Sequence, residues 1–173
     1  LMTTWVSPFY AVSAATPLGQ WHAGGGYASV SSLFFGHVAG CIGETSALAI
    51  LVGGLFLIMM RYIDWRTPLC YIGTVGVLMF ALGEDPLFHM LAGGLFLGAF
   101  FMATDYVTTP ITKKGKIVFS VGAGILVVMI RMIGGFPEGV LFSILIMNAF
   151  TPLIDRATKP RVYGTKAKFL RGG

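Results

Sequence analysis

Residues 116–133 read KIVFSVGAGILVVMIRMI, an apolar run whose only charged members are Lys116 and Arg131. A helix rises 1.5 Å per residue, so a run of this length can cross most of the ~30 Å hydrocarbon core of a bilayer. Four similar runs occupy residues 46–63, 68–83, 86–104 and 137–154. The sequence therefore predicts five transmembrane helices.

The composition agrees with a membrane location. Hydrophobic residues make up 55% of the chain and charged residues 11%, whereas soluble domains carry about 25% charged residues. We expect an all-α integral membrane protein with an outer-face leader at 1–45, a five-helix bundle at 46–155 and a basic tail at 156–173. Because the sequence begins at Leu1, we also expect it to be a fragment of a longer protein.

The distribution of basic residues predicts the orientation of these helices. Arg61 and Arg66 flank the first connection, three lysines lie between 113 and 116, and six basic residues lie in the tail. Arg131 alone is expected at a connection on the other side. The positive-inside rule makes the basic side cytoplasmic and places the leader on the outer face. The net charge of +5 is explained in this way and does not indicate a nucleic-acid partner.

The leader contains a run of small residues ahead of a threonine, Ser13-Ala14-Ala15-Thr16-Pro17-Leu18. This run resembles the [ST]-G-A-[ST] signature at which the phosphate of FMN is esterified to threonine in membrane subunits of ion-pumping redox complexes. Two positions depart from the usual target: Tyr10 stands where an acid is found, and Ala14 stands where glycine is found. Alanine reaches positive φ less easily than glycine does.

Three further stretches extend the resemblance: GHVAGCIGETS at 36–46, MATDYVTTP at 102–110, and GGFPEGV at 134–140 continuing to Met147 and Asn148. Together the four stretches resemble the D subunits of Rnf complexes and, more distantly, the B subunits of sodium-translocating NADH:quinone reductases. The match covers essentially the whole chain and is similar to the C-terminal half of that longer subunit.

The resemblance implies covalent FMN on Thr16, attached by a flavin transferase that uses FAD as donor. Ser13, Ala14, Ala15, Pro17 and Leu18 would shape the site. It also implies a bacterial or archaeal cytoplasmic (inner) membrane location, other Rnf-type subunits as partners, and electron flow coupled to export of Na⁺ or H⁺. The chain would be a subunit of an ion-translocating oxidoreductase without a complete active site. A second, non-covalent flavin such as riboflavin is left open.

Two acidic residues are candidates for an ion or cofactor path, since charges near a membrane interior are functional hypotheses by default. Glu44 precedes the first run, and the alternative is a first-turn acid that favours a helix N-terminus. Asp105 ends the third run in a hydroxyl-rich segment, and the alternative is a solvated turn acid. We expect one-electron reduction of the flavin to change the local charge and so bias a cation site.

The sequence lacks the motifs of metal sites, nucleotide-binding proteins and hydrolases. Cys41 and Cys70 lack paired spacing, the three histidines are isolated, and we predict no metal site. No phosphate-binding loop, dinucleotide fingerprint or nucleophile elbow is present. One alternative is half of a transporter or channel built from repeated helices without a flavin, because Gly-Gly-Leu-Phe-Leu occurs at both 53–57 and 93–97.

Overall fold

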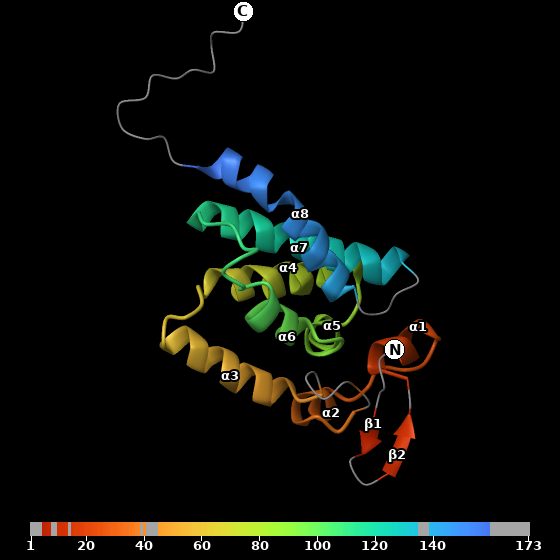
Figure 1. Cartoon of the computed structure of the whole chain (residues 1–173). Coiled ribbons are helices and arrows are strands. Elements are labelled where there is room, and N and C mark those ends of the chain that lie inside the picture. Colours follow the sequence, from red (N-terminus) through yellow and green to blue (C-terminus); the bar gives the residue numbers. More distant parts are fainter. Residues whose placement is uncertain are drawn as a thin grey trace, which may run out of the picture.

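The structure is a computed structural model that describes residues 5–7, 10–13, 15–38, 40, 45–134 and 139–159. It is predominantly helical (Figure 1). The elements are β1 Trp5–Ser7, β2 Tyr10–Ser13, α1 Pro17–His22, α2 Val30–Phe35, α3 Ala47–Met59, α4 Arg66–Leu82, α5 Pro86–Leu91, α6 Leu95–Leu97, the π-helix η1 Gly98–Met102, α7 Lys113–Ile133 and α8 Val140–Thr158.

The expectation of an all-α protein needs one correction in the leader. β1 and β2 form a small antiparallel hairpin in which Trp5 lies opposite Ser13 and Ser7 lies opposite Tyr10. The strand sequences, WVS and YAVS, are rich in aromatic and β-branched residues, which favour extended backbone. Helical structure begins at Pro17, within the last residues of the small-residue run.

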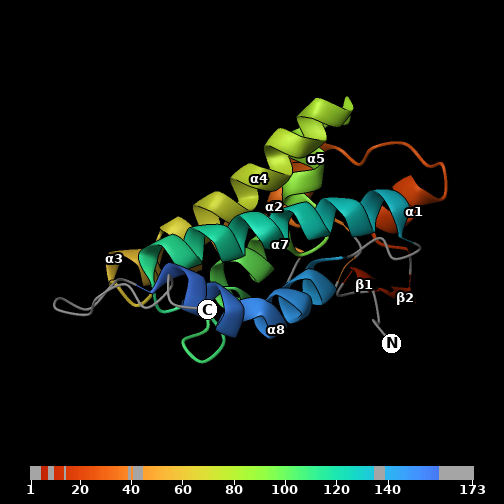
Figure 2. The same ribbon diagram turned by 90° about the horizontal axis from the view of Figure 1, so that it is seen from above.

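Helices α4, α7 and α8 form the centre of the bundle, with α7 packed between the other two (Figures 1 and 2). The hydroxyl of Tyr71 on α4 and the hydroxyl of Ser143 on α8 are hydrogen-bonded at 2.9 Å inside this core. The buried apolar side chains shared by the three helices include Tyr71, Val75, Met79, Phe119, Ala123, Val127, Ile144 and Met147.

Glycines let these helices approach closely, as the small-residue pattern predicts. A Cβ atom on Gly124 would lie 2.8 Å from Cβ of Thr74 and 3.2 Å from the carbonyl oxygen of Tyr71. A Cβ atom on Gly98 would overlap Cγ1 of Val140. The close spacing between α4 and α7, and between η1 and α8, therefore depends on glycine at positions 124 and 98, because any larger residue would place a Cβ atom in the contact.

Gly124→Ala is expected to lower the free energy of unfolding by about 1–3 kcal/mol, because the new methyl group presses on the backbone of α4. Gly73→Ala is the matched control, since nothing lies within 4 Å of its Cβ position and alanine is the better helix former. Thermal unfolding in detergent compares the two variants with wild type. Equal losses of stability in both would contradict close packing at Gly124.

Among the described residues, two of the five expected spans contain helices long and apolar enough to cross a membrane: α7, with 21 residues, and α8, with 19. Helices α3, with 13 residues, and α4, with 17, are apolar but shorter. The number of membrane crossings therefore stays a prediction.

The third expected span, 86–104, is not one continuous helix. It is divided into α5, α6 and η1. Gly93 and Gly94 have φ angles of +71° and +64°, the left-handed region that breaks a right-handed helix. Hydropathy alone does not reveal this break, because apolar residues continue through it.

The break also bears on the internal repeat. Residues 53–57 lie within the continuous helix α3, whereas residues 93–97 run through the two left-handed glycines into α6. The same five residues therefore adopt two different conformations. The repeated helix pair on which the transporter alternative was based is not present in these two segments.

The connections gather at two ends of the bundle. At one, which we call the basic end (residues 60–66, 103–116 and 155–159), Nζ of Lys116 lies 3.6 Å from a carboxylate oxygen of Asp64. The backbone N–H of Ile111 donates to Asp155 over 3.1 Å at the same end. The first and third connections and the end of α8 thus lie together, as the charge pattern requires.

At the opposite end, which we call the leader end (residues 15–38, 83–94 and 131–134), the leader packs on the second connection. The hydroxyl of Tyr27 donates to the carboxylate of Glu84, and this hydrogen bond raises the pKa of Tyr27. Asp85 caps α5 by accepting from the N–H of Leu87 over 3.1 Å. The leader thus lies at the end of α7 that is remote from Lys113 (Figures 1 and 2).

Candidate functional site

Thr16 caps the first helix. Its Oγ1 atom accepts a hydrogen bond from the backbone N–H of Gly19 over 3.2 Å, and Pro17 occupies the first turn. This arrangement is favoured because threonine satisfies a free N–H at a helix start and proline tolerates that position. The side chain of Thr16 is half-buried, so its hydroxyl lies at the edge of the packed structure.

Helix α1 is fixed to the bundle by its next residues. Leu18 is fully buried in a small apolar cluster with Leu33, Phe88 and Ala92. The ring of Trp21 meets the ring of His89 edge to face, with centroids 4.8 Å apart. Thr16 is therefore carried on a short helix with a defined position.

The other residues expected to shape this site are placed only in part. Ala15 is exposed and its carbonyl accepts from the side chain of Gln20 over 3.0 Å, while Pro17 is buried. Ser13 ends β2 as a backbone position. Ala14 and Glu44 lie outside the described residues.

Arg131 is placed differently from the sequence expectation. It does not lie in an exposed connection but is fully buried in the last turn of α7. Its guanidinium donates to the carbonyl oxygens of His89, at 2.6 Å, and Ala92, at 3.1 Å. These carbonyls belong to the C-terminal end of α5, where a helix leaves its last acceptors unsatisfied and favours positive charge.

His89 lies directly beneath α1 and is fully buried. Its ring contacts both Trp21 and Phe88. Neither ring nitrogen has a hydrogen-bond partner among the described residues. Neither His89 nor Arg131 was proposed as a site residue from the sequence, although an arginine inside an apolar run is a signal of a functional or structural role.

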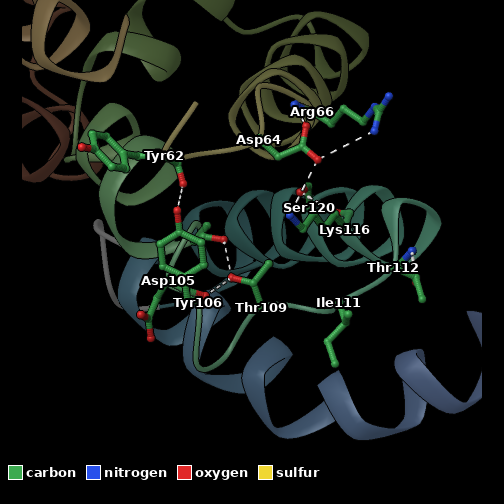
Figure 3. Close-up of polar contacts among 12 residues, drawn as sticks. Tyr62, Asp64, Arg66, Asp105, Tyr106, Thr109, Ile111, Thr112, Lys116 and Ser120 are labelled. Atoms are coloured by element: carbon green, nitrogen blue, oxygen red, sulfur yellow. Dashed lines mark hydrogen bonds and ion pairs between the residues drawn. The ribbon is translucent and has the colours of Figure 1, made fainter. Parts of the chain in front are cut away.

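A second polar region lies at the basic end. A cavity of about 270 Å³ opens there between the first and third connections. Asp64 is partly exposed and forms ion pairs with Lys116 at 3.6 Å and Arg66 at 3.7 Å (Figure 3). The lining includes Tyr62, Asp64, Thr67, Thr104, Asp105, Tyr106, Thr109 and Lys116.

Asp105 belongs to the lining of this cavity and is exposed. Its carboxylate accepts from the hydroxyl of Thr108 over 3.3 Å, and its backbone carbonyl accepts from the hydroxyl of Thr109 over 2.5 Å. The hydroxyl of Tyr106 donates to the carbonyl of Tyr62 across the cavity (Figure 3). The segment is thus a solvated, hydroxyl-rich turn that links the first and third connections.

The structure does not bring the two groups of expected residues together. Thr16 lies at the leader end, and Asp105 lies at the basic end. The 21 residues of α7 between the ends span about 32 Å at 1.5 Å per residue. Asp105 is therefore not a neighbour of the expected attachment site.

The residues at Thr16 fit the covalent flavin that the sequence resemblance implies. The hydroxyl is half-buried on a capped helix, so an ester at Oγ1 leaves the backbone of α1 in place. Beneath the helix, the buried nitrogens of His89 have no hydrogen-bond partner among the described residues and are suited to a polar ligand.

Comparison with known proteins places this geometry in context. Residues 1–164 match the model of the NQR2, RnfD, RnfE family. The chain is 50% identical, over 95% of its length, to the D subunit of a proton-translocating ferredoxin:NAD(+) oxidoreductase complex from Clostridium ljungdahlii, and covers 56% of that protein. It is 51% identical, over 91% of its length, to the D subunit of a Na(+)-translocating ferredoxin:NAD(+) oxidoreductase complex from Acetobacterium woodii, and covers 51% of it. The chain thus spans about half the length of these relatives.

Proposed function

Because the chain belongs to the NQR2, RnfD, RnfE family, we propose that it is the C-terminal half of an electron-transfer subunit in an ion-translocating ferredoxin:NAD oxidoreductase complex. The observation that carries the proposal is the placement of Thr16. Its hydroxyl is half-buried at the start of a helix that is anchored to the membrane bundle by Leu18 and Trp21. The partners are the other subunits of the complex, the lipid bilayer and a flavin transferase.

In this function Thr16 holds FMN through a phosphodiester at Oγ1, and the flavin supplies one-electron redox chemistry. The protein supplies position. The hydrogen bond from Gly19 orients Oγ1, Leu18 fixes the helix in the apolar cluster, and Pro17 sets its first turn. Ala15 is exposed and lies where a transferase can reach the attachment residue.

The cation step belongs to the opposite end in this proposal. Asp105, with the polar cavity beside it, receives Na⁺ or H⁺ on the cytoplasmic side, and the relatives' names include one ion each. Because α7 separates the two ends, coupling between flavin reduction and cation binding must act through the packed helices. A displacement of α5 against α7 is one such route, since Arg131 joins them.

The proposal is tested by determining on which side of the membrane the flavin lies. The full-length protein is placed in right-side-out and in inverted vesicles from a host that contains the flavin transferase, and flavin fluorescence is followed while impermeant iodide is added. We expect quenching in right-side-out vesicles only, because positive-inside orientation places Thr16 on the outer face. Vesicles with Thr16→Ala supply the background.

Two other results would contradict the proposal in different ways. Fluorescence equal to the Thr16→Ala background would contradict the covalent flavin. Quenching in inverted vesicles only would keep the flavin but reverse the orientation.

A further inference from the structure

The imidazole of His89 is a buried polar group without a hydrogen-bond partner in the described part of the chain. Its exposed fraction is 0%, and neither Nδ1 nor Nε2 forms a hydrogen bond to any described residue. A neutral imidazole carries one donor and one acceptor. Leaving such groups unpaired away from water is costly, so native structures supply them with a partner. We therefore ask which ligand could supply the hydrogen bonds that the described residues do not give to His89.

The surroundings of the ring limit where that partner can be. The centroid of Trp21 lies 4.8 Å away, and that of Phe88 lies 5.2 Å away. The carbonyl of His89 accepts from the guanidinium of Arg131 at 2.6 Å, which fixes the backbone from which the ring projects. Of these neighbours, Trp21 belongs to the helix that begins at Thr16.

The distance from Thr16 to this ring is within reach of a tethered flavin. Trp21 follows Thr16 by five residues, which corresponds to about 7.5 Å along a helix axis, and the His89 ring lies a further 4.8 Å from the Trp21 ring. The ribityl chain and three-ring system of FMN together exceed that length. They also carry hydroxyl groups, carbonyl oxygens and ring nitrogens that can pair with both imidazole nitrogens.

We propose that His89 is a flavin-binding residue, the buried hydrogen-bond partner of the FMN carried on Thr16. This inference rests on the proposed function. The indole of Trp21, which is half-buried, covers the imidazole and must turn aside when the flavin is attached. Arg131 acts through the backbone of α5 as the positioning residue for His89.

The test uses the full-length flavinylated protein purified in detergent, with wild type, His89→Leu, His89→Gln and the control His22→Leu. His22 lies on the same helix as Trp21 and is exposed. Intact mass reports covalent FMN, redox titration reports the flavin midpoint potential, and infrared difference spectra with ¹⁵N-labelled histidine report imidazole groups that respond to flavin reduction.

We expect every variant to retain one FMN. Wild type and His22→Leu should show ¹⁵N-sensitive imidazole bands on flavin reduction, and His89→Leu should lose them. Hydrogen-bond donation favours the more electron-rich reduced flavin, so His89→Leu should shift the ratio of reduced to oxidised flavin about tenfold toward oxidised, or ~59 mV for one electron. His89→Gln, which keeps a donor and an acceptor, should recover part of the potential.

The outcomes separate this inference from the proposed function. FMN in all variants, with unchanged potentials and no imidazole bands in wild type, would overturn the role of His89 alone. Absence of FMN from wild type would overturn both. If His89→Leu does not fold, the wild-type infrared bands and the potential of His89→Gln still decide the matter.

Discussion

Arg131→Met is expected to lower the free energy of unfolding by about 2–6 kcal/mol, because two buried carbonyl groups would lose their donor at a cost of about 1–3 kcal/mol each. The guanidinium is fully buried and bonds two carbonyl oxygens, those of His89 and Ala92. Methionine fills a similar volume but donates no hydrogen bond. The carbonyl groups of His89 and Ala92, at the C-terminal end of α5, would then lack the donor that Arg131 provides. Each buried carbonyl without a hydrogen bond costs about 1–3 kcal/mol.

Thermal unfolding of the purified chain in detergent measures this effect. Arg156→Met is the matched control, because Arg156 is exposed near the end of α8 and surface changes usually stay within about 0.5 kcal/mol. Arg131→Lys should fall between wild type and Arg131→Met, because one ammonium group does not reproduce the forked geometry of arginine. Equal stability of Arg131→Met and wild type would show that the guanidinium does not hold α5.

Much of the bundle could be predicted from the sequence because hydropathy and charge report on burial. The runs at 46–63, 68–83, 116–133 and 137–154 correspond to α3, α4, α7 and α8 within a few residues. The clustering of basic residues predicted that the first and third connections lie together, and the ion pair of Asp64 with Lys116 confirms their proximity.

The break in the third run could not be read from hydropathy, because Gly93 and Gly94 are as compatible with a close helix contact as with left-handed backbone. At 53–57 the same five residues continue helix α3, so the sequence of these residues alone does not determine their conformation. We attribute the break at Gly93 and Gly94 to tertiary contacts, such as the hydrogen bonds from Arg131 to the carbonyls of His89 and Ala92. The hairpin was missed because its strands are only three and four residues long.

Only part of the candidate site could be predicted from the sequence. Thr16 could be singled out from its small-residue context, and its place as a helix cap agrees with the hydroxyl that precedes Pro17. His89 could not, since an isolated histidine carries no spacing signal. Only the fold shows that it lies fully buried against Trp21 of the same helix as Thr16.

Thr16→Ala is expected to abolish covalent flavin, because alanine has no oxygen to form the phosphodiester. The change also removes a helix cap, which costs about 1 kcal/mol, so loss of flavin could arise from misfolding of α1. Thr16→Asn separates these effects. Asparagine is a good cap that can accept from the N–H of Gly19 in place of Thr16, yet it offers no hydroxyl for the ester.

Thr16→Ser completes the series, because serine both caps a helix and keeps a hydroxyl. We expect flavin in wild type and, at an equal or reduced level, in Thr16→Ser. We expect none in Thr16→Asn, although its thermal stability should match that of wild type without flavin. Flavin in Thr16→Asn would mean that another residue carries the attachment.

The central claim, that Thr16 carries FMN, is tested most directly by the intact mass of this chain made with a working flavin transferase. The account predicts that wild type gains the mass of one FMN less one water, that fragmentation assigns the gain to Thr16, and that Thr16→Asn has its unmodified mass. An unmodified wild-type chain, or a gain on any other residue, would contradict it.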